Sequence, residues 1–176
     1  MGHVKDITNL NSLTKWVQDQ FDTRLNWDDV KRIKDWWGGK LIIKGIMDPD
    51  DAKMAKQCGA DALVVSNHGG RQLDGVNSSI STLPQIKKAV SNMEVLMDGG
   101  ISSVQDILKA IALGAEGVMI GRSFVYGLSA GGKEGVTKSL EILNKELDMT
   151  MALCGRRDIK DVGRDIIKDC PFFEKN

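Results

Sequence analysis

The chain repeats one pattern, GADALVVSN at residues 59–67 and GAEGVMIGR at residues 114–122. Each copy is typical of a helix that ends near a glycine and turns into a short buried strand. Two further apolar runs, residues 41–43 and 94–97, are each followed within two residues by glycine. Longer amphipathic segments separate these runs, and the alternation predicts an α/β fold with about four parallel strand–helix units.

Capping residues and glycines set the expected boundaries. We expect strands over residues 41–43, 62–65, 94–97 and 117–120. A helix is predicted from the Asp48-Pro49 start to Gly59, a second over about 83–90, and a third after a cap at Ser102 or Ser103. A long helix is predicted over 123–153, broken near Gly131-Gly132.

Composition narrows the class of protein. The 176 residues are 41% hydrophobic, and 24 basic residues balance 24 acidic ones, so no large field exists to hold nucleic acid or an anionic membrane. Wholly apolar runs are far shorter than the ~20 residues needed to cross a bilayer, and no signal-peptide pattern is visible. Cys58, Cys154 and Cys170 are too scattered for a disulfide framework or a zinc site. We expect a cytoplasmic protein with no metal and no membrane segment.

Four units are half of a closed barrel. An eight-stranded (β/α)8 barrel needs at least ~200 residues, whereas an open arc of four strands leaves two hydrogen-bonding edges exposed. The predicted organisation is a helical lead-in over 1–39, a half-barrel domain over 40–160 and a tail over 161–176. We therefore expect half of a TIM barrel that pairs with another copy or with a missing half.

Glycine-rich turns follow the last two predicted strands. Asp98-Gly99-Gly100 and Gly121-Arg122 combine backbone that can approach a phosphate with a guanidinium that can bind it. Either turn alone would be an ordinary turn. Because ligands bind at the carboxyl ends of parallel strands, two such turns on adjacent strands indicate a phosphate-bearing cofactor.

The second predicted strand is followed by SNHGGRQLD at residues 66–74. His68 offers a base with a pKa near neutrality, and Arg71 can hold a carboxylate through two parallel hydrogen bonds. A lone loop histidine is more often merely solvated, but the chain has only one other, His3, which we assign to a mobile terminus. Lys44, at the end of the first predicted strand, can stabilise negative charge on a bound cofactor.

These motifs, together with Lys44-Gly45 and the run ALGA at 112–115, resemble the C-terminal half of the FMN-dependent α-hydroxy acid oxidases and dehydrogenases. That family includes glycolate oxidase, L-lactate dehydrogenases and mandelate dehydrogenase. The resemblance runs from about Gln20 to Ile159 and includes Phe21-Asp22 and Trp27. The two glycines after His68 and the Asp74-Gly75 pair favour the dehydrogenases over the oxidases.

The resemblance implies a role for each matching residue. His68 would be the base that removes a proton from an L-2-hydroxy acid, and Arg71 would bind the substrate carboxylate. FMN would accept the electrons and leave a 2-oxo acid, by hydride transfer or through a carbanion. The residues implied in FMN binding are Lys44, Ser66, Asp98, Gly99, Gly100, Ile101, Ser102, Gly121 and Arg122.

Two departures from the family pattern stand out. The family has an arginine where this chain has Ser102, so one charged phosphate partner is missing. The N-terminal half that supplies two active-site tyrosines, an aspartate that orients the histidine and the membrane-anchoring segment of some members is not encoded here, and Tyr126 matches neither tyrosine. We therefore expect the isolated chain to be weakly active or inactive, and the parent enzyme to be cytoplasmic or peripheral to the membrane.

Two other interpretations stay open. The chain could be a catalytically incomplete half-barrel that self-associates and at most binds FMN or phosphate. It could also be another phosphate-binding barrel, related to type 2 isopentenyl diphosphate isomerase or IMP dehydrogenase. The spacing of His68 and Arg71 disfavours the second of these.

Overall fold

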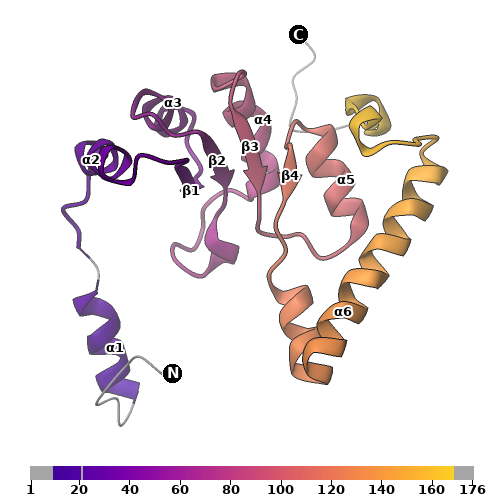
Figure 1. Ribbon diagram of the computed structural model, residues 1–176, viewed down its shortest axis with the longest axis horizontal. Helices are drawn as coiled ribbons and strands as arrows, with labels where there is room; N and C mark the ends of the chain where they lie inside the picture. Colours follow the sequence, from indigo (N-terminus) through magenta and orange to yellow (C-terminus); the bar gives the residue numbers. More distant parts are fainter. Residues whose placement is uncertain (1–9, 21, 169–176) are drawn as a thin grey trace.

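The computed structural model describes residues 10–20 and 22–168. One parallel sheet has the strand order β1-β2-β3-β4, with bounds Ile42–Ile46, Ala62–Val65, Glu94–Met97 and Gly117–Val118. Successive strands are joined by helices α3 (Pro49–Gln57), α4 (Ser79–Ala89) and α5 (Val104–Ala112), and α6 (Arg122–Leu153) follows β4 (Figure 1). The structure therefore confirms the prediction of four parallel strand–helix units.

Further helices flank this unit. Helices α1 (Leu10–Asp19) and α2 (Trp27–Trp37) precede the sheet, and short 3-10 helices η1 (His68–Gly70), η2 (Ile159–Asp161) and η3 (Arg164–Ile166) lie in loops. The domain limits at residues 39 and 160 stay predictions. His3, Phe21 and Cys170 lie outside the described residues. Within the described ranges, no helix is long and apolar enough to span a bilayer.

Three predicted boundaries were wrong. Strand β1 extends to Ile46, so Lys44 lies inside the strand rather than at its end. Helix α4 begins at Ser79 rather than near residue 83, because the Ser78 hydroxyl accepts the backbone N–H of Ser81 and caps an earlier turn. Strand β4 ends at Val118, although Met119 N still donates to Met97 O at 2.9 Å.

The helices cover one face of the sheet. Leu63 and Val65 of β2 are fully buried in a cluster with Leu83 and Ile86 of α4. Side chains alternate between the two faces of a strand, so the residue between Leu63 and Val65, and those in register with it, face away from the helices. Lys44 is one of these residues, because it is in register with Val64 of β2. Val64 is in turn in register with Leu96 of β3. The strand period therefore turns the Lys44 side chain away from the helical layer.

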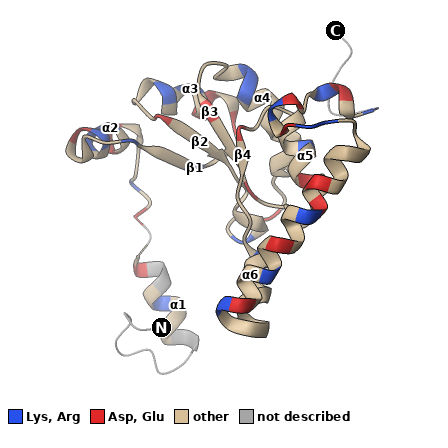
Figure 2. Ribbon diagram, turned by 45° about the vertical axis from the view of Figure 1, so that its right-hand side comes forward, with Lys and Arg blue, Asp and Glu red and all other residues tan. Residues whose placement is uncertain are grey.

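The predicted break in α6 is confirmed at Gly131 and Gly132, both of which have non-helical backbone angles. On either side of the break the backbone doubles back on itself. A Cβ atom added to Gly135 would lie 1.9 Å from the carbonyl oxygen of Gly127, so this close approach requires glycine. Lysines, arginines and acidic residues are interspersed along α6 (Figure 2).

The repeated sequence forms the same hydrogen-bonded turn twice at the amino end of the sheet. Asp61, before β2, accepts Leu41 N at 2.9 Å, Lys34 Nζ at 2.6 Å and Lys40 Nζ at 2.7 Å. These hydrogen bonds from Lys34, Lys40 and Leu41 hold the pKa of Asp61 well below its usual range.

Glu116, before β4, accepts Val95 N at 2.8 Å and pairs with Lys87 Nζ. Lys87 also donates to Met93 O at 3.0 Å. Each carboxylate therefore ties the start of one strand to the strand beside it and to a lysine from a neighbouring helix.

Candidate active site

The residues singled out by sequence gather at the carboxyl edge of the sheet. Lys44 Nζ donates to Ser66 Oγ at 3.0 Å and forms an ion pair with Asp98 Oδ2 at 2.9 Å. These three side chains come from β1, the residue after β2 and the residue after β3. One lysine inside β1 therefore links that strand to the ends of β2 and β3, although it lies far apart in sequence from both of its partners.

The loop after β2 is attached to this network. His68 N donates to Ser66 Oγ at 3.1 Å, so the same buried hydroxyl serves both Lys44 and the loop. His68 itself is exposed and has φ of 56°, a left-handed conformation that non-glycine residues seldom adopt. Such strain persists where the surroundings enforce it, and it is commonest at functional sites.

Two guanidinium groups flank the same loop. Arg71 Nε donates to His68 O at 3.1 Å, which orients the Arg71 side chain beside the histidine. A Cβ atom placed on Gly69 would lie 3.9 Å from Arg71 Nε and 3.9 Å from Arg122 Nη2. Arg122 is the first residue of α6, which follows β4 after residues 119–121, so the segment after the fourth strand also reaches this loop. In Figure 1 the η1 loop and the start of α6 both lie below the strands.

The site is thus cationic, with one carboxylate. Arg71 and Arg122 lie beside the loop that carries His68, and Lys44 is joined to that loop through Ser66. Asp98 partly offsets their charge. An arrangement with one imidazole and several fixed cations suits an anionic ligand and proton transfer beside it.

The structure also passes a test for a phosphate-bearing cofactor. Asp98 Oδ1 is buried and has no hydrogen-bond partner within the described part of the chain, so a ligand hydroxyl could satisfy it. A Cβ atom on Gly100 or Gly121 would meet nothing within 4 Å, so the space beside both glycines is open. Gly121 caps α6 without a side-chain hydrogen bond, so no side chain at the cap accepts the first backbone N–H groups of this helix.

Ile101 and Ser102, at the end of the Asp98–Ser102 turn, differ in their exposure to solvent. Ile101 is buried in the core cluster. Ser102 is exposed, but its backbone N–H and its hydroxyl both donate to Asp106 Oδ2, at 3.1 and 3.2 Å. Burial raises the pKa of Asp106, but hydrogen bonds from Ser103 and Ser102 outweigh burial and lower that pKa overall.

Sequence reasoning missed two side chains, Asn67 and Ser79. The Ser79 hydroxyl accepts Asn67 N at 3.1 Å, and Asn67 Oδ1 accepts Gly69 N at 3.0 Å. Ser79 follows another serine in a polar stretch, and its burial could not be read from that pattern. Asn67 was quoted only as part of a motif.

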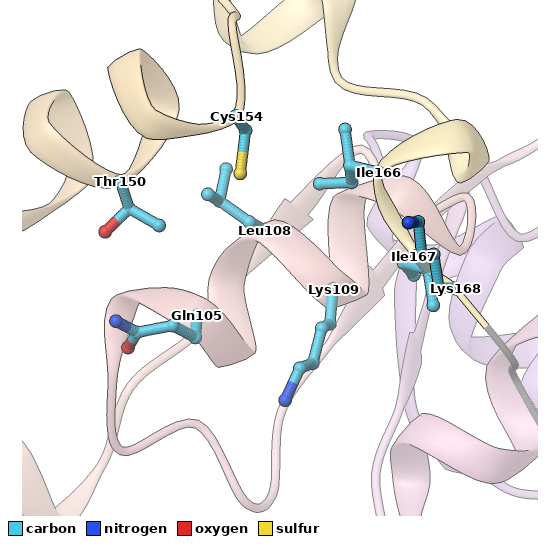
Figure 3. A pocket seen from close by; sticks show the side chains of 8 residues that line it. All are labelled: Gln105, Leu108, Lys109, Thr150, Cys154, Ile166, Ile167 and Lys168. Carbon is cyan, nitrogen blue, oxygen red and sulfur yellow. The ribbon is translucent and has the colours of Figure 1, made fainter.

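His68 lines neither of two pockets on the described part of the chain. One, of about 390 Å³, is lined by Gly45, Met47, Asp48, Asp51, Gly75, Val76 and Asn77. An apolar one of about 250 Å³ lies between α5, the end of α6 and η3, with Leu108, Cys154 and Ile166 among its lining residues (Figure 3). Over residues 10–20 and 22–168, no group of three His, Cys, Asp or Glu residues is placed to hold a metal ion.

The family model and the similar proteins of known function identify the same family for this chain. Residues 2–169 match the family model of the FMN-dependent dehydrogenases. The chain is 47% identical over 163 residues to an L-lactate dehydrogenase of Caulobacter vibrioides, covering 92% of this chain and 43% of that protein. An L-lactate dehydrogenase of Actinobacillus pleuropneumoniae is 47% identical over 174 residues, with 96% and 46% covered.

Solved structures agree. The monotopic membrane protein (S)-mandelate dehydrogenase superposes with a TM-score of 0.85 at 36% identity, covering 94% of this chain and 44% of its own. A mandelate oxidase gives a TM-score of 0.82 at 39% identity, with 89% and 46% covered. The chain therefore spans less than half the length of the relatives it matches, and the prediction of half a TIM barrel is confirmed.

Proposed function

Because the chain belongs to the FMN-dependent dehydrogenase family, we propose that it forms the FMN- and substrate-binding half of an enzyme that oxidises an L-2-hydroxy acid to a 2-oxo acid. The observation that carries this proposal is the convergence of His68, Arg71, Arg122 and the Lys44–Asp98 pair at one edge of the sheet. Parallel α/β proteins bind their ligands at that edge.

In this proposal His68 and Arg71 act on the substrate. The Arg71 guanidinium, oriented by His68 O, binds the substrate carboxylate and fixes the α-carbon near the imidazole. His68 accepts one proton from the substrate. Oxidation removes two electrons and two protons in all, from the hydroxyl group and the α-carbon, and leaves a carbonyl.

The cofactor residues form the other side of the site. When bound, FMN supplies the two-electron acceptor. Gly100, Gly121 and Arg122 would hold its phosphate, Asp98 Oδ1 would accept a hydroxyl of its chain, and Lys44 would stabilise negative charge on its ring. Ser66, Gly99, Ile101 and Ser102 complete the proposed FMN-binding turns.

The complete activity is proposed for an assembly with the region that the relatives have and this chain does not match. We expect the chain supplied with FMN to reduce a dye with lactate, glycolate or mandelate slowly or not at all. Refolding it with the unmatched part of the Caulobacter vibrioides L-lactate dehydrogenase should restore turnover. Ordinary turnover by the chain alone would refute the need for a second half, and a refolded complex that binds no FMN would refute the proposed function.

A second candidate is self-association of an incomplete half-barrel. It is supported by the outer positions of β1 and β4, each of which has one edge with no strand partner among the described residues. Trp36 and Ile42 near the β1 edge, and Tyr126 after β4, are large exposed apolar side chains. Light scattering at micromolar concentration tests this: a dimer or larger species supports it, and a monomer rules it out.

The parent enzyme is proposed to act in the cytoplasm, free or bound peripherally to the membrane. The low cysteine content without paired spacing supports a location in the cytoplasm. The similarity to (S)-mandelate dehydrogenase, a monotopic membrane protein, supports the peripheral alternative. Fractionation of cells that express the whole protein tests the location.

A further inference from the structure

The loop that carries His68 is held from two sides. From one side, Ser66 Oγ accepts His68 N at 3.1 Å. From the other, Ser79 Oγ accepts Asn67 N at 3.1 Å, while Asn67 Oδ1 accepts Gly69 N at 3.0 Å. The backbone amides of residues 67, 68 and 69 therefore each donate to a side-chain oxygen, and the left-handed turn at His68 lies between them.

The Ser79 hydroxyl contacts this loop and does not cap its own helix. It is 1% exposed, although it is the first residue of α4, where a serine could equally face solvent. The N-terminal cap of α4 is provided by its neighbour Ser78, so capping does not explain the second serine. A buried hydroxyl is retained only where it is hydrogen-bonded, and the hydrogen bond found here reaches Asn67.

The turn after β3 packs on the same two side chains. A Cβ atom on Gly99 would lie 2.7 Å from Asn67 Oδ1 and 2.9 Å from Ser79 Oγ, and Gly99 has φ of 82°. Glycine is therefore required at residue 99 for both space and backbone conformation. As a result, the turn at one strand end and the loop at the next strand end form one packed unit.

We propose that Asn67 and Ser79 are positioning residues, which hold His68 in its left-handed conformation and so direct the imidazole toward the substrate. The role in presenting the base rests on the proposed function, whereas the effect on loop conformation does not. Neither side chain needs to touch substrate, because each acts through the backbone of residues 67–69.

The test compares Ser79→Ala and Asn67→Ala with Asn67→Asp in the full chain by NMR. Ser79→Ala should speed amide hydrogen exchange at Asn67 tenfold or more and change the HN–Hα coupling of His68, which reports φ. Asn67→Ala should speed amide exchange at Gly69 and also change the His68 coupling. Asn67→Asp keeps an acceptor oxygen, so its Gly69 exchange rate and its His68 coupling should match those of the wild type. Ser81→Ala is the matched control, because the Ser81 hydroxyl donates to Ser78 O in the same helix at 2.8 Å.

An unchanged His68 coupling in Ser79→Ala and Asn67→Ala, or an equal change in Ser81→Ala, would overturn the proposal. Two alanine variants at sites of different burial keep the test valid if the buried one fails to fold. In the refolded two-part enzyme, Ser79→Ala should lower kcat about tenfold or more with little change in KM for lactate. Loss of FMN binding by the wild-type assembly would contradict the proposed function alone, since the NMR result on the loop stands without it.

Discussion

The two ends of the parallel sheet differ in how completely their carboxylates are hydrogen-bonded within the protein. At the amino end, Asp61 and Glu116 each accept a backbone N–H and pair with lysine, so each carboxylate is surrounded by donors. At the carboxyl end, Asp98 has a buried oxygen without a protein partner in the described chain, and His68 has a strained backbone. The amino end satisfies these carboxylates within the fold, and the carboxyl end leaves one carboxylate oxygen, Asp98 Oδ1, for a ligand.

This difference separates stability from function along the strands. Changes at the amino end should lower the free energy of unfolding and leave ligand binding alone. Changes of exposed side chains at the carboxyl end, such as His68, should alter binding and turnover with little effect on stability. The same division is found in complete (β/α)8 barrels, where loops at the carboxyl face carry the chemistry. Four predictions test how cleanly it holds in this half-barrel.

The largest effect is expected at His68. His68→Gln removes the base while keeping a polar side chain, so turnover of the refolded two-part enzyme should fall by about 10²–10⁴-fold. The free energy of unfolding of the chain should stay within about 0.5 kcal/mol of the wild-type value, because His68 is exposed. Stopped-flow dye reduction and urea unfolding measure the two quantities. If His68→Gln lost stability but kept turnover, the carboxyl end of the sheet would serve stability and not function, which contradicts the proposed division.

The next effect is expected at Glu116. Glu116→Ala leaves the buried Val95 amide and the Lys87 ammonium without their carboxylate partner. An unsatisfied buried donor costs about 1–3 kcal/mol, and urea unfolding should show a loss of that size. FMN binding should not change. Glu94→Ala, at the exposed start of β3, is the control and should lie within about 0.5 kcal/mol of wild type.

A smaller effect is expected at Ser102, where the family pattern has an arginine. Ser102→Arg would add a charged donor beside the open space at Gly100 and should tighten FMN binding roughly tenfold or more, since a charge-assisted hydrogen bond contributes about 1.5–3 kcal/mol. Ser102→Ala loses the same hydroxyl without adding charge and is the control. Equal affinity for the arginine and alanine variants, measured by flavin fluorescence quenching, would show that residue 102 does not face the phosphate.

The sequence predicted the architecture because each strand is short, apolar and followed by a glycine turn. Strand β2 and strand β3 have the predicted bounds, and the break in α6 lies at the two predicted glycines. The misplaced starts and ends have local causes. A serine cap one turn earlier moved α4 to Ser79, and pairing with β2 carried β1 past Lys44 to Ile46.

The site was predictable only as far as residue type reveals chemistry. His68, Arg71 and Arg122 carry groups that signal function, and the carboxyl-edge rule placed them together. Asn67 and Ser79 carry ordinary polar groups whose importance comes from burial and from a hydrogen bond across 12 residues. No periodic pattern encodes that contact, because it depends on the fold as a whole.

The smallest effect is the pH dependence that Asp61 gives to stability. Its folded-state pKa lies below the ordinary aspartate value of about 3.9, through hydrogen bonds from Lys34, Lys40 and Leu41 N. A group with a lowered folded-state pKa stabilises the protein above its unfolded-state pKa, and this contribution is lost as pH falls. Asp61→Asn keeps an acceptor for Leu41 N but removes the charge, so it should be less stable than wild type at pH 7. That difference should shrink below about pH 4, and urea unfolding from pH 7 to pH 3 measures it. Asp35→Asn on α2 is the exposed control. If the wild-type advantage over Asp61→Asn stayed constant down to pH 3, the paired lysines would not be stabilising the charged form, and the amino end of the sheet would owe its stability to the neutral hydrogen bonds alone.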